Sequence, residues 1–568
     1  MKKIVGIALC LAAVIAIGLY VMLPGKTAVN SYARFLPPDA LAAVNLSHSS
    51  TRIDKFAATP LGKLLAKDTI HAIAGERSAD IAEYDRLYDA VAKVANDPAF
   101  RAVFGDDATL AMLPLDHKAL TGDPGAALRD SLVVIARTSV AGALDMLSRL
   151  ITNAQISRET VDGLNLMKIT IESGQVFYGY TEGPVVFLAC APAAIKACLA
   201  AGKGEAALDK APSFQEAAAF WQTFPEEKTH SRTYLNTPAA AELLKTADVP
   251  ELKEAGDMLT GISAIYSIDY ETSQGMESRG RGGLVHDQLH PVLKSMFDTT
   301  GKGNQTLHLL KENVLAYFWE SSLQMEQIIK TLESDEKEKH QKIDSELRQN
   351  LGVSLEELGK TFGPQYGVVL DDIVRTPLFP WPKMILFVEV RDRAIAEKAL
   401  NGMRRLVAEQ GGTSEEQEQV DGQTIYSWPV MPGEVQPAAL LTGNMLYLST
   451  NKQTLKEMLA VKTAPGVLAE SVAAQMGADM SGRIKAANWS NIVLFPARMA
   501  RPTGEILEWL GAFLGHSSRQ INMERLNREL VQFMQSTELV EWDMQVTRER
   551  FEVAMTVVAA KKPVAGGQ

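Results

Sequence analysis

The chain has 568 residues, of which 46% are hydrophobic and 22% are charged, so it is long and apolar enough to fold around about two to four globular cores. This composition excludes an intrinsically disordered protein. The formal net charge of -11 argues against a protein that binds nucleic acid or anionic lipid headgroups by general electrostatic attraction, because its summed field repels polyanions.

The first residues have the pattern of a membrane anchor. Lys2 and Lys3 precede an uncharged run from Ile4 to Leu23, and a helix of that length spans about 30 Å, the thickness of a hydrocarbon core. The two lysines favour a cytoplasmic N-terminus, so we expect a single-pass inner (cytoplasmic) membrane protein with its body in the periplasm or outside the cell. The alternative is a cleaved secretory signal that ends near Ser31-Tyr32-Ala33, although the apolar run is long for one.

Cys190 and Cys198 are the two cysteines that follow the N-terminal run. An oxidising compartment would permit them to form a disulfide. If the segment after Pro192 is helical, they lie about two turns apart, beyond ordinary disulfide reach. We therefore predict two buried thiols that act as small hydrophobic side chains, with the disulfide as the alternative.

The chain also repeats itself. Four segments recur in the same order at offsets of 274, 258, 259 and 260 residues, and this consistency indicates a duplication. The pairs are Pro38–Val44 with Glu312–Phe318, Phe104-Gly105 with Phe362-Gly363, Val161–Gly163 with Val420–Gly422, and Gly183–Ala200 with Gly443–Ala460.

The duplication predicts two homologous α+β modules, at residues 34–291 and 306–560. A breaker-rich linker at 292–305 joins them. Residues 1–33 form the cytoplasmic tip, the transmembrane signal anchor and a short linker, and residues 561–568 form a flexible tail.

Each module mixes the periods of strands and helices. Val185–Ala189 and Met384–Val390 are predicted strands, because they are short and rich in β-branched or aromatic residues. Helical spacing follows at Arg393–Leu406, and the Asp-Gly pairs at Asp162 and Asp421 predict tight turns. The predicted fold is therefore two tandem modules, each a largely antiparallel sheet with helices packed on one face, after one N-terminal transmembrane helix.

The segment Arg34–Val44, which reads RFLPPDALAAV, resembles the opening of a family of uncharacterised bacterial envelope proteins. Those proteins begin with a signal anchor and a Phe-Leu-Pro-x-Asp-x-Leu-Ala type segment and are known only as a domain of unknown function. The resemblance implies a two-part extracytoplasmic region from Arg34 to about Ala560, and it transfers no catalytic residue. The second module has Lys311-Glu312-Asn313 at the equivalent place, so its assignment depends on the duplication alone.

The sequence contains no strong catalytic, cofactor or metal motif. His286 and His290 have the i, i+4 spacing of a zinc-binding helix, but Pro291 follows at once, and Asp287 is better placed as the N-cap of a helix from Pro291. Gly25-Lys26-Thr27 resembles the end of a phosphate loop but lacks the required earlier glycine. We therefore predict no cofactor and no enzyme activity.

The segment from Arg375 to Lys383 is the strongest candidate for a partner contact. Three prolines stiffen a loop that carries Phe379 and Trp381, and rigid aromatic side chains can anchor a protein partner. The alternative is that the two rings cover the adjacent strand from Met384.

These features favour a non-enzymatic, membrane-anchored extracytoplasmic protein whose modules bind or organise an envelope protein or polymer. A duplication without a repeated polar cluster suits a binding surface better than a chemical centre. The second hypothesis is a carrier or chaperone for a lipid or other apolar ligand, which requires an open cavity lined by the repeated apolar positions. The third is an envelope hydrolase, which requires a nucleophile and a base brought together by folding.

Overall fold

The computed structural model describes residues 32–560, except for 48, 75–78, 106, 116–121, 139–143, 145–154, 171–173, 205, 247–248, 299–302, 377, 411–413, 432–434, 462 and 515–520. The chain divides into two compact units, which we call the first and the second unit. The first is Met1–His290 with Gln520–Asn522, and the second is Pro291–Arg519 with Met523–Gln568.

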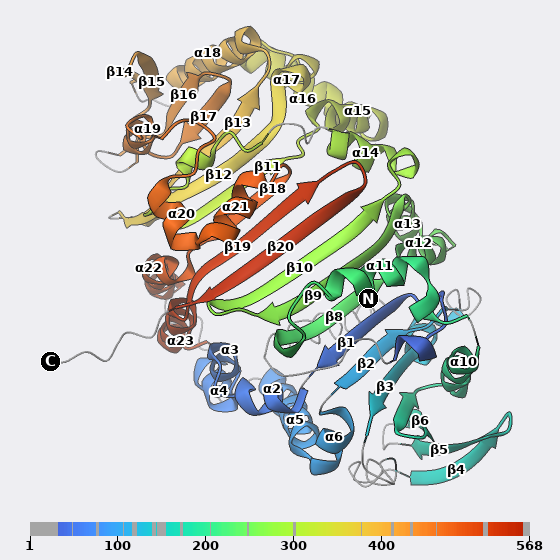
Figure 1. Cartoon of the computed structure of the whole chain (residues 1–568). Coiled ribbons are helices and arrows are strands. Elements are labelled where there is room, and N and C mark those ends of the chain that lie inside the picture. The colour runs from blue at the N-terminus through green and yellow to red at the C-terminus, as the bar shows by residue number, and fades with distance from the viewer. Residues whose placement is uncertain are drawn as a thin grey trace. The chain divides into compact units, whose positions relative to one another are not determined.

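The first unit combines an antiparallel sheet with short helices (Figure 1). Its strands are β1 (Ala42–Ser47), β2 (Asp107–Met112), β3 (Leu132–Arg137), β4 (Gln155–Val161), β5 (Leu164–Thr170), β6 (Val176–Glu182), β7 (Val185–Ala189), β8 (Thr229–Leu235), β9 (Ile262–Glu271) and β10 (Gly275–Leu284). Its helices are η1 (Ala33–Phe35), α2 (Ser49–Phe56), α3 (Pro60–Leu64), α4 (Lys67–Ala74), α5 (Ala79–Asn96), α6 (Pro98–Phe104), α8 (Pro124–Ser131), α10 (Pro192–Lys203), η2 (Leu208–Lys210), α11 (Pro212–Trp221), η3 (Glu226–Lys228), α12 (Thr237–Lys245), α13 (Pro250–Met258) and η4 (His286–Gln288).

The second unit is built from the same kinds of elements. Its strands are β11 (Ala316–Ser321), β12 (Phe362–Arg375), β13 (Pro380–Val390), β14 (Glu416–Val420), β15 (Gln423–Ser427), β16 (Ala438–Thr442), β17 (Met445–Ser449), β18 (Ser490–Leu494), β19 (Thr537–Val546) and β20 (Arg550–Ala559). Its helices are α14 (Pro291–Asp298), η5 (Leu307–Leu309), α15 (Met325–Asp335), α16 (Lys337–Asn350), α17 (Leu355–Thr361), α18 (Arg393–Gln410), α19 (Lys452–Leu459), α20 (Glu470–Met476), α21 (Ala478–Ala486), α22 (Pro496–Leu514) and α23 (Met523–Gln535).

The strand order is the same in both units. In the first unit it is β4-β5-β6-β7-β3-β2-β1-β8-β9-β10, and in the second it is β14-β15-β16-β17-β13-β12-β11-β18-β19-β20. The pairing register also agrees: Ala42 pairs with Met112, and Ala316 pairs with Leu370. These two pairs are separated by the same offsets that relate the repeated sequence segments.

The expected division into two sheets is wrong, because the pairings assign all the described strands to one 20-stranded sheet. A repeat in the sequence identifies equivalent segments. It does not specify which strands share a sheet, because strands pair through backbone groups that nearly every residue carries.

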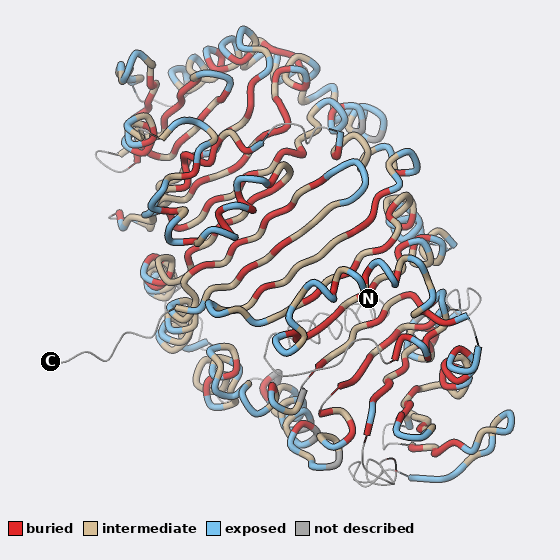
Figure 2. Tube along the Cα trace, viewed as in Figure 1, coloured by how far each residue is buried: buried red, intermediate tan, exposed pale blue. Residues whose placement is uncertain are grey.

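Helices do not pack on one face only, which also corrects the expected fold. In β16, Ala438 and Leu440 belong to one core cluster with α19, α20 and α21, while Ala439 and Leu441 belong to another with α18. Successive side chains of a strand point to opposite faces of the sheet. Apolar residues at consecutive positions therefore require cover on both faces, and Figure 2 shows buried residues along most strands.

The expected single-pass membrane protein is corrected as well. Within the described part of the chain, no helix is long and apolar enough to cross a membrane. The longest, α22 with 19 residues, carries charged side chains such as Arg501 and Glu505 along its length. The run from Ile4 to Leu23, on which the transmembrane helix and the inner-membrane placement rested, lies outside the described residues, as does the tail at 561–568.

Several local predictions are confirmed. Val185–Ala189 forms β7, and the predicted strand Met384–Val390 and helix Arg393–Leu406 lie within β13 and α18. The Asp-Gly pairs form two-residue turns between β4 and β5 and between β14 and β15, where Asp162 has φ 50° and Asp421 has φ 48°. Positive φ at both central residues is typical of the type I′ hairpin turn.

Part of the expected linker at 292–305 is ordered in the second unit. Its first residues belong to α14. Near its end, the buried Asn304 amide donates hydrogen bonds to the Tyr317 hydroxyl (2.8 Å) and to Asn491 Oδ1 (3.0 Å). These contacts attach the segment before β11 to the core of the second unit.

Candidate functional site

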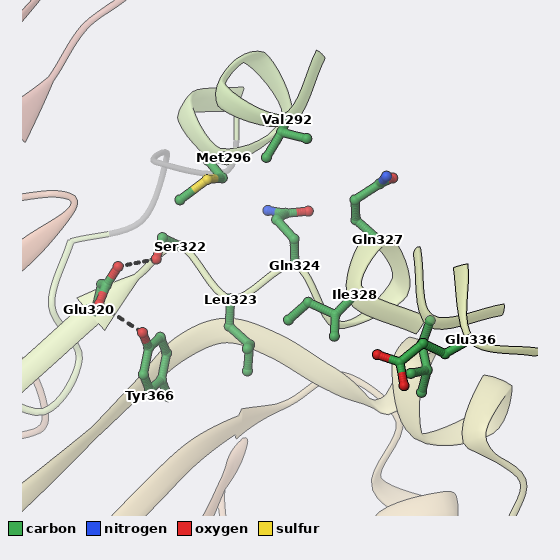
Figure 3. Close-up of a pocket in the computed structure, with 11 residues that line it drawn as sticks. Val292, Met296, Glu320, Ser322, Leu323, Gln324, Gln327, Ile328, Glu336 and Tyr366 are labelled. Carbon is green, nitrogen blue, oxygen red and sulfur yellow. Dashed lines mark hydrogen bonds between the residues drawn. The ribbon is translucent and has the colours of Figure 1, made fainter. Parts of the chain in front are cut away.

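The second unit contains an apolar cavity of about 600 Å³ (Figure 3). Its volume lies within the range of pockets that bind small molecules. The walls come from α14, from β11 and the segment that follows it, from α15, and from β12. The lining residues are Val292, Met296, Glu320, Ser322, Leu323, Gln324, Gln327, Ile328, Leu332, Glu336 and Tyr366.

Helical spacing presents the apolar part of this lining. Val292 and Met296 are four residues apart in α14, and Ile328 and Leu332 are four residues apart in α15, so each pair lies on one helix face. Ile328 keeps 54% of its surface exposed although it is a large aliphatic residue. The cavity is therefore open to a ligand on the side of α15.

Alternation along β11 brings a carboxylate to the same cavity. Tyr317 and Trp319 are fully buried in the core of the second unit. The alternate residues Phe318 and Glu320 therefore point to the opposite face of the sheet. Tyr366 of β12 pairs directly with Glu320. The polar end of the cavity is thus fixed by the register of two neighbouring strands.

Two hydroxyl groups hold the Glu320 carboxylate. The Tyr366 hydroxyl donates to Glu320 Oε2 at 2.7 Å, and the Ser322 hydroxyl donates to Glu320 Oε1. Burial, together with the hydrogen bond to Glu320, raises the pKa of Tyr366 to about 12. Tyr366 therefore remains a protonated donor at neutral pH and fixes the carboxylate in position.

The lining contains two carboxylates, which lie at opposite ends of the cavity: Glu320 at one end and Glu336 at the other (Figure 3). Glu336 is exposed and forms an ion pair with Lys339 at 2.9 Å. Among the described lining residues, none is lysine, arginine or histidine. The charge that faces the cavity is therefore negative, and that of Glu320 is held by hydroxyl groups without a lining cation.

The polar end has no counterpart at the corresponding strand positions of the first unit. By strand register, Leu46 and Ala108 form the pair of the first unit that corresponds to Glu320 and Tyr366. The carrier hypothesis required a cavity lined by repeated positions, and this cavity differs from that expectation.

A second cavity of the second unit, of about 670 Å³, is polar and is lined by the segment before β11 and by residues of β12, β13, α19 and α22. Its lining contains two ion pairs: Lys311 lies 3.5 Å from Asp371, and Arg501 lies 3.4 Å from Asp372. Burial raises the pKa of Asp371. The lining also carries Lys383, Glu457 and Arg498, so charges of both signs face this cavity.

Of the predicted contact residues, Phe379 lies in the turn between β12 and β13, and Trp381 is the second residue of β13. Their rings are 5.6 Å apart and both are partly buried, and the Trp381 indole donates to the Thr450 carbonyl at 3.3 Å. Leu378 beside them is 65% exposed, and its carbonyl accepts a 2.8 Å hydrogen bond from the Trp509 indole. The turn therefore combines ring packing on the unit with an exposed apolar tip.

The remaining candidates are placed as follows. His286 and Asp287 lie in the short helix η4, so Asp287 is not the N-cap of α14 as predicted. Within the described ranges, no group of three or more His, Cys, Asp or Glu residues could hold a metal ion.

Cys190 and Cys198 are free thiols. Cys198 is buried in the core of the first unit, and this burial raises the pKa of its thiol to about 12. Cys190 is partly buried.

Sequence reasoning missed the cavity. The one local signal is Glu320, a charged residue that directly follows the apolar run from Val314 to Trp319. A charge in a predicted strand is an ordinary edge or surface feature, so this signal had no specificity before folding brought α14 and α15 beside it.

Comparisons with known proteins are consistent with an uncharacterised family. A family model described as "Protein of unknown function (DUF3352)" matches residues 103–471. Two solved structures, crystal forms III and I of TP0453, are each 8% identical over 46% of this chain and 80% of the other, with TM-scores of 0.22 and 0.20. No curated protein matches the chain significantly.

Proposed function

The chain belongs to the DUF3352 family of proteins of unknown function, and from this premise we propose that it binds an apolar or amphipathic small molecule in the cavity of the second unit. The observation that supports this proposal is the accessible apolar lining from α14 and α15. All the lining residues fall inside the range matched by the family model. We also propose that the opening segment Arg34–Val44, which precedes that range, is a feature of the family.

Ile328 allows a direct test of the proposal. Its side chain lines the cavity and is largely exposed, so Ile328→Asn should leave the fold intact. Loss of the aliphatic contact should weaken binding of a neutral apolar dye such as Nile red about tenfold, as measured by fluorescence titration of the full-length protein.

Val467→Asn is the matched control, because Val467 is 50% exposed in the same unit and does not line the cavity. Its dye affinity should equal that of the wild type. Equal affinities for all three proteins would show that the dye binds elsewhere and would overturn the proposal.

A second candidate function is recognition of a protein partner by the apolar surface around Leu378. Phe513 is 74% exposed and stacks on Trp509, whose indole is hydrogen bonded to the Leu378 carbonyl. Exposed aromatic side chains on a rigid frame suit an interface anchor. A photo-crosslinker at position 378 should trap one protein in cells and lose it in Phe513→Ser; unchanged trapping would contradict this function.

A further inference from the structure

We infer that the ligand of the second unit's cavity is a single-chain amphiphile with a cationic, hydrogen-bond-donating head, such as a primary ammonium group, and that Glu320 binds this head. The inference rests on the proposed function and specifies the chemistry of its ligand.

The first argument for this ligand is the hydrogen-bonding capacity of Glu320. An ionised carboxylate has about four lone-pair positions and no donor. The hydroxyl groups of Tyr366 and Ser322 occupy one position on each oxygen. Glu320 lines the cavity with further acceptor capacity, so the group that complements it is a donor. A carboxylate or phosphate head would bring only acceptors and a repelling charge.

The second argument is the negative charge of the cavity lining. The described lining contains two carboxylates and no basic side chain, and the whole chain has a formal net charge of -11. Glu336 is paired with Lys339, whereas Glu320 is held by neutral hydroxyl groups. A hydrogen bond between two charged groups is stronger than one between neutral groups, especially beside apolar walls that exclude water. Glu320 therefore favours an ammonium over a neutral hydroxyl.

The third argument is the position of the apolar residues in the cavity lining. Figure 3 shows Met296, Leu323 and Ile328 between Glu320 and the far end of the cavity. A ligand with its head at Glu320 would lay its alkyl chain along these side chains and shield them from water. The corresponding positions of the first unit hold Leu46 and Ala108, which cannot bind such a head, so we expect one such ligand per chain.

The test compares three probes with the same alkyl chain: dodecylamine, dodecanol and dodecanoic acid. Their affinities for the full-length protein are measured near neutral pH, below the concentration at which each probe aggregates, by displacement of Nile red. The wild type should bind the amine most tightly and the acid most weakly. In Glu320→Gln, affinity for the amine should fall about tenfold to a hundredfold, while affinity for dodecanol should change less than about twofold.

The dodecanol affinity shows that the cavity of Glu320→Gln remains folded. Glu336→Gln is the matched control, because it removes the other lining carboxylate, which already has a lysine partner; its affinity for the amine should stay within about twofold of the wild type. Failure of all three probes to bind the wild type would overturn the proposed function. Binding of all three with equal affinity, or strongest binding of the acid, would leave that function standing and overturn the inference about the head group.

Discussion

At the residue scale, the buried cluster of Arg483, Glu541 and Asp543 gives the free energy of unfolding a testable dependence on pH. Arg483 donates to Glu541 Oε2 and to Asp543 Oδ2, each at 2.9 Å, and to the Thr556 hydroxyl at 2.8 Å. Glu541 is fully buried on β19, two residues before Asp543 on the same face. Burial and the adjacent Asp543 raise the pKa of Glu541, because burial and a neighbouring like charge both disfavour the ionised carboxylate. The Arg483 guanidinium is also shared with a third carboxylate, since it donates to Asp479 Oδ2 as well.

This shift has a definite sign. In the folded protein Glu541 keeps its proton at pH values where the unfolded chain has lost it, so the free energy of unfolding falls as the pH rises above the ordinary carboxyl pKa of about 4.3. Glu541→Gln should reduce that fall by up to about 1.4 kcal/mol per pH unit, as measured by urea unfolding between about pH 5 and pH 8. The exposed Glu549→Gln serves as control. A slope unchanged from the wild type in Glu541→Gln would contradict the assignment.

At the element scale, the effect of replacing a glycine on the free energy of unfolding depends on its backbone conformation, even where there is room for a side chain. Gly422 follows Asp421 in the turn between β14 and β15 and has φ 76°. Gly482 lies inside helix α21 and is exposed. A Cβ atom added at either position would meet no atom within 4 Å. The two glycines therefore differ in backbone conformation and not in steric room.

Alanine substitutions at these positions should have opposite effects on the free energy of unfolding. Gly422→Ala should lower it by about 1 kcal/mol, because positive φ is unfavourable for a residue with a Cβ. Gly482→Ala should raise it by about 0.5 to 1 kcal/mol, because alanine loses less backbone entropy in a helix. Denaturant unfolding of both variants measures the difference. Effects of the same sign would contradict this account of the turn or of the helix.

At the scale of the whole molecule, each unit has hydrophobic cores of its own. Each of the four core clusters described draws its members from one unit only. Of the seven tryptophans, Trp221 lies in the first unit and the others lie in the second. Trp221 is buried and its indole donates to the Ser267 carbonyl at 2.9 Å. Tryptophan fluorescence of Trp221→Phe therefore reports on the second unit alone.

Trp221→Phe should destabilise the first unit by about 2 kcal/mol, through the lost hydrogen bond and the smaller ring. If the two units unfold independently, the fluorescence signal, which reports on the second unit, will keep the same denaturant midpoint as before the substitution. The circular dichroism transition of the first unit will move to a lower denaturant concentration. We expect this separation. A common shift of both signals would show instead that the units unfold as one cooperative body.

The periodicity of the amino-acid sequence was sufficient to predict several local elements. β7, β13 and α18 follow from apolar spacing, and the turns at Asp162 and Asp421 follow from the preference of Asp-Gly pairs for positive φ. These features depend on neighbours in the chain, so side-chain patterns record them. The repeated offsets reappear in the strand register, where Ala42 pairs with Met112 and Ala316 pairs with Leu370.

The joining of the strands in one sheet, the helices on both faces and the cavity depended on tertiary structure. Strands pair through backbone groups that nearly every residue carries, and apolar residues at successive strand positions do not specify which helix packs on them. Glu320 illustrates the limit: its partner Tyr366 lies in another strand, and Met296 in a separate helix. No local pattern relates these three residues, because only the register of β11 with β12 and the packing of α14 and α15 bring them together.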